Sequence, residues 1–201
     1  MASDYVRVLA DYIEDQARPV DKFGHQPRLV ALTEAVGTDL EYDRDVVTAA
    51  AWLHDLGVFV GHRPEDPEKL ASWDHVAYAC SRGTAILREA GFPGEKVPAV
   101  LQAIREHQLK DEPTTMEGTI LRDADILEQL GAVGILRAVS KVGRDTRFPR
   151  FTDAVTLLRR NLDDLPGKIR LTSARRLAQP RIDLLREFLR AVDDESGTNL
   201  F

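Results

Sequence analysis

Residues 43–57, DRDVVTAAAWLHDLG, decide the fold class. Apolar residues recur there at three- and four-residue spacing, which is the period of one face of a helix. The stripe consists of Val47, Ala50, Ala51 and His54. The pattern predicts a helix over 43–56, with the His54 imidazole on its buried face and the Asp55 carboxylate at its end. Gly57 then marks a break.

The same periodicity extends along nearly all of the 201 residues, and strand patterning is nearly absent. It predicts helices over 4–17, 26–37, 43–56, 72–91, 95–109, 116–130, 131–142, 150–163 and 173–193. Glycine and proline clusters separate them. We therefore expect an all-α bundle of about eight to nine helices in a single domain, 1–201. Its core would span about 20–140, with C-terminal helices over 150–193 packed on it.

The composition excludes several classes of protein. A hydrophobic content of 43% and a charged content of 30% are typical of a globular chain. The net charge of −6 argues against a nucleic-acid polymer as partner, although a small anionic ligand remains compatible with it. No apolar run approaches the roughly 20 residues that span a bilayer. A single cysteine, Cys80, excludes an intrachain disulfide and a cysteine-based zinc cluster. With no signal-peptide pattern at the start, we expect a cytoplasmic protein.

Histidine and aspartate side chains interrupt the apolar faces of five predicted helices. They are His25, His54, Asp55, His75, His107 and Asp123. A single histidine on an apolar face is more often a satisfied core residue than a ligand. Buried carboxylates are rarer and costly without a partner, so this combined set would make a poor core unless a cation lay among its members. The sequence therefore predicts a site for a divalent metal inside the bundle.

The order of these residues resembles the H…HD…D signature of the HD superfamily. His25 comes first, the doublet lies in WLHDLG (52–57), and Asp123 lies in ILRDAD (120–125). Further segments are similar to the small bacterial HD hydrolases typified by the YpgQ-like proteins, over roughly residues 20–190. The resemblance implies metal ligation by His25, His54, Asp55 and Asp123. It also implies hydrolysis of a phosphate ester or anhydride, and in the YpgQ-like group of a nucleotide.

The roles of His75 and His107 stay open at this point. With them the order resembles dinuclear HD proteins, in which Asp55 would bridge two ions. The same order also resembles the mixed-valent diiron oxygenases of the superfamily, which cleave C–C or C–P bonds with O₂, although the local sequence around 116–134 favours the hydrolase group. In a mononuclear site, both would instead touch substrate phosphate. One or two ions of manganese, iron, cobalt, nickel or zinc suit imidazole and carboxylate ligands. A module that only binds is the non-enzymatic alternative.

Other candidates rest on weaker signals. Asp55 or Asp123 could orient the attacking water, and Glu106 could be a general base, although its neighbour His107 faces inward and so directs Glu106 toward solvent. Cations near the predicted ligands in sequence are candidates to bind the phosphorylated substrate: Lys22, Arg28, Arg122 and Arg137. The loop 57–71 is either a lid or a surface connection. We expect His62 in that loop to be solvent-exposed. An exposed apolar helix face would make a homodimer unsurprising.

Overall fold

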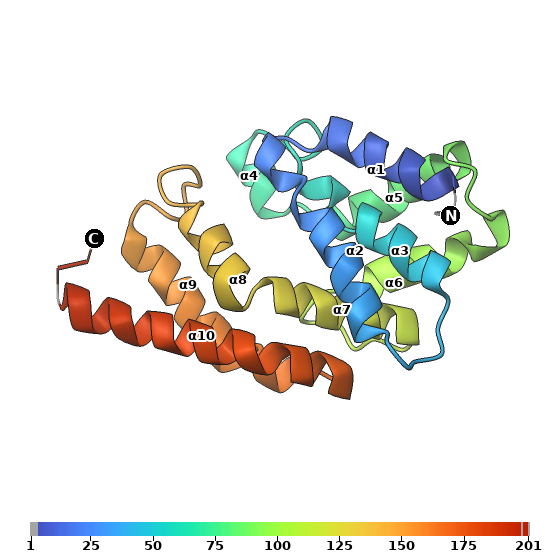
Figure 1. The fold of residues 1–201 in the computed structure, drawn as a ribbon. Helices are drawn as coiled ribbons and strands as arrows, with labels where there is room; N and C mark the ends of the chain where they lie inside the picture. Colours follow the sequence, from blue (N-terminus) through green and yellow to red (C-terminus); the bar gives the residue numbers. More distant parts are fainter. Residues whose placement is uncertain (1–3, 198, 201) are drawn as a thin grey trace. The chain divides into compact units, whose positions relative to one another are not determined.

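The computed structural model describes residues 4–197 and 199–200. This part of the chain consists of ten α-helices and short 3₁₀ turns without a β-strand (Figure 1), which confirms the predicted all-α fold. The chain divides into two compact units, the first ending at Arg122 and the second starting at Asp123. A single domain stays a prediction. No described helix has the length and hydropathy needed to cross a membrane.

The first unit is organised around one apolar helix, α3. Its helices are α1 (Asp4–Gln16), α2 (His25–Val36), α3 (Arg44–Leu53), α4 (Pro67–Ala71), α5 (His75–Glu89), α6 (Val97–Glu106) and the first turns of α7 (Met116–Glu128). From Val46 to Leu53, every residue of α3 except Thr48 is buried. A helix that is apolar on all sides belongs in a core, and α3 packs against α1, α2 and α6.

The start of α3 is fixed by a cap and a cluster of charges. Asp43 Oδ1 accepts hydrogen bonds from the backbone N–H groups of Asp45 (3.0 Å) and Val46 (3.3 Å). Lys96 Nζ lies 2.9 Å from Asp43 Oδ2 and 2.7 Å from Asp45 Oδ2. The Tyr5 hydroxyl donates to Asp45 Oδ1 at 2.7 Å. Residues from α1 and from the turn before α6 therefore meet at this helix end.

The end of α3 differs from the prediction. The helix ends at Leu53, so His54 is its C-cap and Asp55, with φ −100° and ψ 12°, turns the chain into a 3₁₀ turn over Leu56–Val58. This turn passes very close to the start of α5, since a Cβ on Gly57 would lie 2.6 Å from the carbonyl oxygen of His75. Gly57 thus allows His75 to approach the His-Asp doublet.

The loop 57–71 is less irregular than predicted. Its last five residues form α4, with Pro67 in the first turn and the Asp66 carboxylate accepting from the N–H groups of Glu68 and Lys69 at 3.0 Å each. An N-capping aspartate followed by proline is a regular helix start. The prediction missed it because the segment lacks an apolar stripe.

The second unit contains the end of α7 with α8 (Gly131–Val139), α9 (Phe151–Asp164) and α10 (Thr172–Ser196). The last three pack against one another in pairs. Arg181 Nη1 of α10 donates to the Leu127 carbonyl oxygen at 2.9 Å and so joins α10 to the end of α7. Gly131, with φ +67°, makes the turn between α7 and α8. The helices predicted from periodicity in this part of the chain are confirmed.

The Asp43 cap gives a first prediction. Asp43→Ala removes the acceptor for two N–H groups at the start of α3, and we expect the free energy of unfolding to fall by about 1 kcal/mol. Asp43→Asn keeps a side-chain oxygen that can cap and should lose less. Urea unfolding of both variants measures the difference, and equal stability of the alanine and asparagine variants would contradict the role of the cap.

A second prediction concerns pH. Hydrogen bonds from Lys96 and Tyr5 hold the pKa of Asp45 below its ordinary value. The folded chain therefore protonates this carboxyl less readily than the unfolded chain, so the stabilisation is present above the unfolded pKa and is lost as pH falls through the folded pKa. We expect the stability difference between wild type and Asp45→Asn to shrink as the pH falls below about 4, the ordinary pKa of an aspartate. A difference independent of pH in thermal melts would contradict this.

Candidate metal centre

Two imidazoles are held in the same way, each directly after the last residue of a helix. His54 Nδ1 lies 3.0 Å from the Ala51 carbonyl oxygen, and His107 Nδ1 lies 2.6 Å from that of Ile104. A carbonyl oxygen only accepts, so in this assignment Nδ1 carries the proton and Nε2 presents a lone pair. A ligating histidine is commonly fixed by such a bond to its second nitrogen. The His54 and His107 side chains are therefore oriented so that Nε2 can bind a cation.

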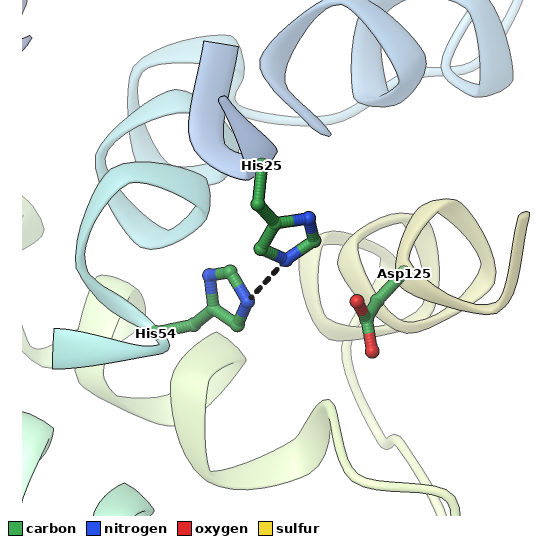
Figure 2. A group of neighbouring side chains, drawn as sticks. All are labelled: His25, His54 and Asp125. Carbon is green, nitrogen blue, oxygen red and sulfur yellow. Dashed lines mark hydrogen bonds between the residues drawn. The ribbon is translucent and has the colours of Figure 1, made fainter. Parts of the chain in front are cut away.

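Three potential ligand atoms converge at the His54–Asp55 doublet. His25, in the first turn of α2, and His54 bring their Nε2 atoms to 3.3 Å from each other (Figure 2). Asp55 Oδ2 lies 3.7 Å from His25 Nε2 and 3.5 Å from His54 Nε2. His25 and His54 are only 6% and 0% exposed. Three electron-rich atoms thus face one another in a nearly equilateral triangle with little access to water.

The size of this triangle fits a transition-metal ion. The point equidistant from its corners lies about 2.0 Å from each, which matches the usual length of zinc–imidazole and zinc–carboxylate bonds. A shared proton could bridge only one edge of the triangle at a time. A divalent cation would satisfy all three atoms together, so the donor set and its spacing both fit such an ion.

His75 lies at the other carboxylate oxygen of Asp55, and His107 lies beside His54 and Asp55. His75 Nε2 is 3.9 Å from Asp55 Oδ1, and the ligand atoms of His54, Asp55 and His107 all lie within 4.8 Å of one another. Burial raises the pKa of Asp55, but the surrounding imidazoles outweigh it and hold that pKa well below the ordinary value. The imidazoles with this effect are His54, His25, His107 and His75. The carboxyl is therefore ionised, with Oδ2 facing His25 and His54 and Oδ1 facing His75.

Asp123, the predicted ligand in the second unit, is fully buried. Its Oδ2 accepts from the backbone N–H groups of Arg170 at 3.0 Å and Leu171 at 2.7 Å, just before α10 begins. Ligating carboxylates commonly have such hydrogen bonds. The turn before α10 thus fixes the orientation of this side chain, and its role as a ligand stays a prediction.

Two expectations about single side chains are wrong. Glu106 does not face solvent, since it is only 6% exposed. Burial raises its pKa, but hydrogen bonds led by Thr114 and Thr115 outweigh this and lower the pKa to about 2. His62 is half-buried and not free in the loop, because its Nδ1 lies 2.9 Å from the Tyr78 hydroxyl. Periodicity missed both because their partners come from distant segments.

The predicted substrate-binding cations differ in their surroundings. Lys22 and Arg28 are exposed, on either side of His25 in the sequence. Arg122 is buried, at 3% exposure. In the second unit, Arg137 Nη1 lies 3.4 Å from Glu128 Oε2. Gln108, which was not among the predicted site residues, brings its Nε2 to 3.4 Å from His75 Nε2. In the sequence, only its position directly after His107 points to it.

The fold and this cluster define an all-helical protein with a buried histidine–carboxylate centre suited to a divalent ion. The chain belongs to the HD domain family, whose sequence profile matches residues 23–130. Membership implies a bound divalent metal and, in general terms, hydrolase chemistry.

Individual relatives agree with this family. The chain is 25% identical to YpgQ of Bacillus subtilis (strain 168) over 182 residues, 85% of this chain and 82% of the relative. It is similar to the crystal structure of Bacillus subtilis YpgQ, with a TM-score of 0.78, 21% identity and 97% of each chain covered. It is also similar to a predicted HD superfamily hydrolase from an uncultured Thermotogales bacterium, with a TM-score of 0.64, 25% identity and coverage of 96% and 91%.

The triangle of ligand atoms predicts the metal content of variants. We expect His54→Ala to weaken Mn²⁺ binding by more than about 100-fold, since loss of an outer partner alone typically costs 10- to 100-fold. Calorimetric titration, together with elemental analysis of protein purified without chelator, measures this. His62→Ala is the matched control, because His62 contacts Tyr78 and Gln16 instead of the cluster. Unchanged binding by folded His54→Ala would refute the assignment.

Proposed function

We propose that the protein is a metal-dependent phosphohydrolase that cleaves a phosphate ester or anhydride, with a nucleotide as the first substrate class to test. The observation that carries this proposal is the convergence of His25 Nε2, His54 Nε2 and Asp55 Oδ2 within 3.3–3.7 Å of one another. A hydrogen bond between His25 Nε2 and His54 Nε2 accounts for one edge of this triangle, whereas a divalent ion accounts for all three.

The residues divide into those that would hold the ion and those that face the substrate. His25, His54 and Asp55 would hold it, and the family signature adds Asp123 as a fourth ligand. When bound, the ion supplies a Lewis acid that lowers the pKa of a water molecule and neutralises charge on the phosphoryl group. His75 has a side chain 29% exposed, and that of Asp55 is 21% exposed. These two partly open groups would orient the attacking water and a phosphate oxygen.

The reaction needs only water as co-reactant. The water oxygen forms a bond to phosphorus while the bond from phosphorus to the leaving oxygen breaks, and the water proton ends on the leaving oxygen or in solvent. Glu106 is a poor candidate for the base, because its pKa of about 2 makes it a weak one at neutral pH. Asp55 Oδ1, on the His75 side, is better placed to direct the water.

A nucleotide is supported by a relative. Bacillus subtilis YpgQ has been crystallised in complex with ADP, and this chain matches that structure with a TM-score of 0.76, 21% identity and 96% of each chain covered. Lys22 and Arg28, exposed on either side of His25 in the sequence, supply positive charge that suits a polyphosphate.

The proposal predicts hydrolysis that depends on both metal and doublet. Nucleoside diphosphates and triphosphates are incubated with the protein and Mn²⁺, Co²⁺, Ni²⁺ or Zn²⁺, and phosphate and pyrophosphate are measured. We expect a chelator to abolish turnover and Asp55→Asn to lower it by at least about 100-fold. The His62→Ala variant should keep the turnover of wild type.

Other outcomes would overturn the proposal. Two equivalents of iron with O₂ uptake and no phosphate release would replace it with the diiron oxygenase alternative. Failure to bind any divalent ion would leave a non-enzymatic module.

A further inference from the structure

The Glu106 carboxylate, which directly precedes His107 in the chain, accepts four hydrogen bonds. Its Oε1 accepts from Thr114 Oγ1 at 2.5 Å and Gln102 Nε2 at 2.6 Å. Its Oε2 accepts from Thr115 Oγ1 at 2.7 Å and from the Thr115 backbone N–H at 3.2 Å. We call these four residues, Gln102, Glu106, Thr114 and Thr115, the Glu106 cluster.

The four bonds use the full capacity of the carboxylate. An ionised carboxylate offers about four lone-pair sites, two on each oxygen. In the Glu106 cluster each oxygen already has two donors. Glu106 therefore has no lone pair left to accept a proton from an attacking water, which sets it apart from Asp55.

The same bonds close the loop between α6 and α7. Glu106 is the last residue of α6, and Thr114 and Thr115 directly precede α7. Thr115 Oγ1 also accepts from the Gly118 N–H at 3.0 Å, and a Cβ on Gly118 would lie 2.5 Å from Glu106 Oε2. The buried charge of Glu106 thus holds the end of α6 and the start of α7 together. Gly118 has no side chain where the Glu106 carboxylate contacts α7.

The closed loop carries two residues of the candidate centre. His107 follows Glu106 directly, and Gln108 Nε2 lies 3.4 Å from His75 Nε2. Gln108, Lys110 and Asp111 line a cavity of about 260 Å³, together with Arg105 of α6, Asp74 and residues at the start of α5. Because Gln108 contacts both His75 and this cavity, the cavity borders the partly exposed side of the centre.

We propose that Glu106 is a positioning residue, which holds the loop 107–113 so that His107 and Gln108 face His75 and Gln108 forms part of the wall of a cavity for the substrate. The assignment of this cavity to the substrate rests on the proposed function. The positioning of His107 and Gln108 does not, because metal binding and loop order are measurable without substrate.

The experiment compares variants that break the Glu106 cluster from both sides. Glu106→Gln removes the charge, and Thr114→Val removes the hydroxyl that donates to Glu106 Oε1. Thr114→Ser keeps the hydroxyl and is the matched control. Hydrogen exchange over 107–113, Mn²⁺ affinity, and kcat and KM are measured for each, after thermal melts have shown that each variant folds.

A positioning role predicts the same pattern for Glu106→Gln and Thr114→Val. Exchange over 107–113 becomes faster, Mn²⁺ affinity falls by about tenfold as for other outer partners, and KM rises more than kcat falls. Thr114→Ser resembles wild type.

Two results would overturn the proposal. A general base predicts a kcat loss of about 10²- to 10⁴-fold confined to Glu106→Gln, with an altered pH profile and Thr114→Val unaffected. Unchanged exchange and Mn²⁺ affinity in Glu106→Gln would show that the loop does not depend on it. If His54→Ala lowers Mn²⁺ affinity while Glu106→Gln does not, only this inference fails; if neither does, the metal centre fails as well.

Discussion

The carboxylate of Asp55 is the constraint on which the first unit depends. It lies 3.5–3.9 Å from three imidazole nitrogens, and burial alone would make its charge unfavourable. Protonated histidines nearby favour the ionised form, whereas neutral histidines would direct Nε2 lone pairs toward one another and the carboxylate. Such a set is stable as a group only with protons or a cation among its members. The surrounding helices therefore have to bring histidines from four separate segments to one carboxylate.

Two of these histidines also solve an ordinary problem of helix ends. The last carbonyl groups of a helix have no partner within it. At the end of α3 and of α6, an imidazole directly after the last residue binds the carbonyl oxygen three positions earlier. The bond satisfies a backbone acceptor and at the same time directs Nε2 away from the helix. The early end of α3 at Leu53 is thus part of how His54 is oriented, because a continued helix would use that carbonyl for its own ladder.

Periodicity in the sequence predicted the helices and the inward direction of His25, His54 and His107 because burial of an apolar face is a local, repeating signal. It failed where a distant partner decides. The sequence predicts that His54 and Asp55 belong to the helix, because His54 continues its apolar stripe. The close packing of Gly57 against His75 explains why the chain turns after Leu53 instead. The sequence predicts an exposed Glu106 because its neighbour His107 points inward. In the structure, Thr114 and Thr115, directly before α7, donate hydrogen bonds to the Glu106 carboxylate and cover it. Contacts between distant segments do not repeat along the sequence, so a search for periodicity does not find them.

The candidate centre is closed on one side and open on the other, and this asymmetry suits a hydrolase. His25 and His54 are nearly inaccessible, whereas the side chains of Asp55 and His75 are 21% and 29% exposed. A buried pair of ligands protects a bound ion from loss to water, and an accessible pair leaves room for the substrate. Asp55 belongs to both sides, since Oδ2 faces the buried pair and Oδ1 faces His75. Its two oxygens therefore link the place where an ion would be held to the place where a phosphate could enter.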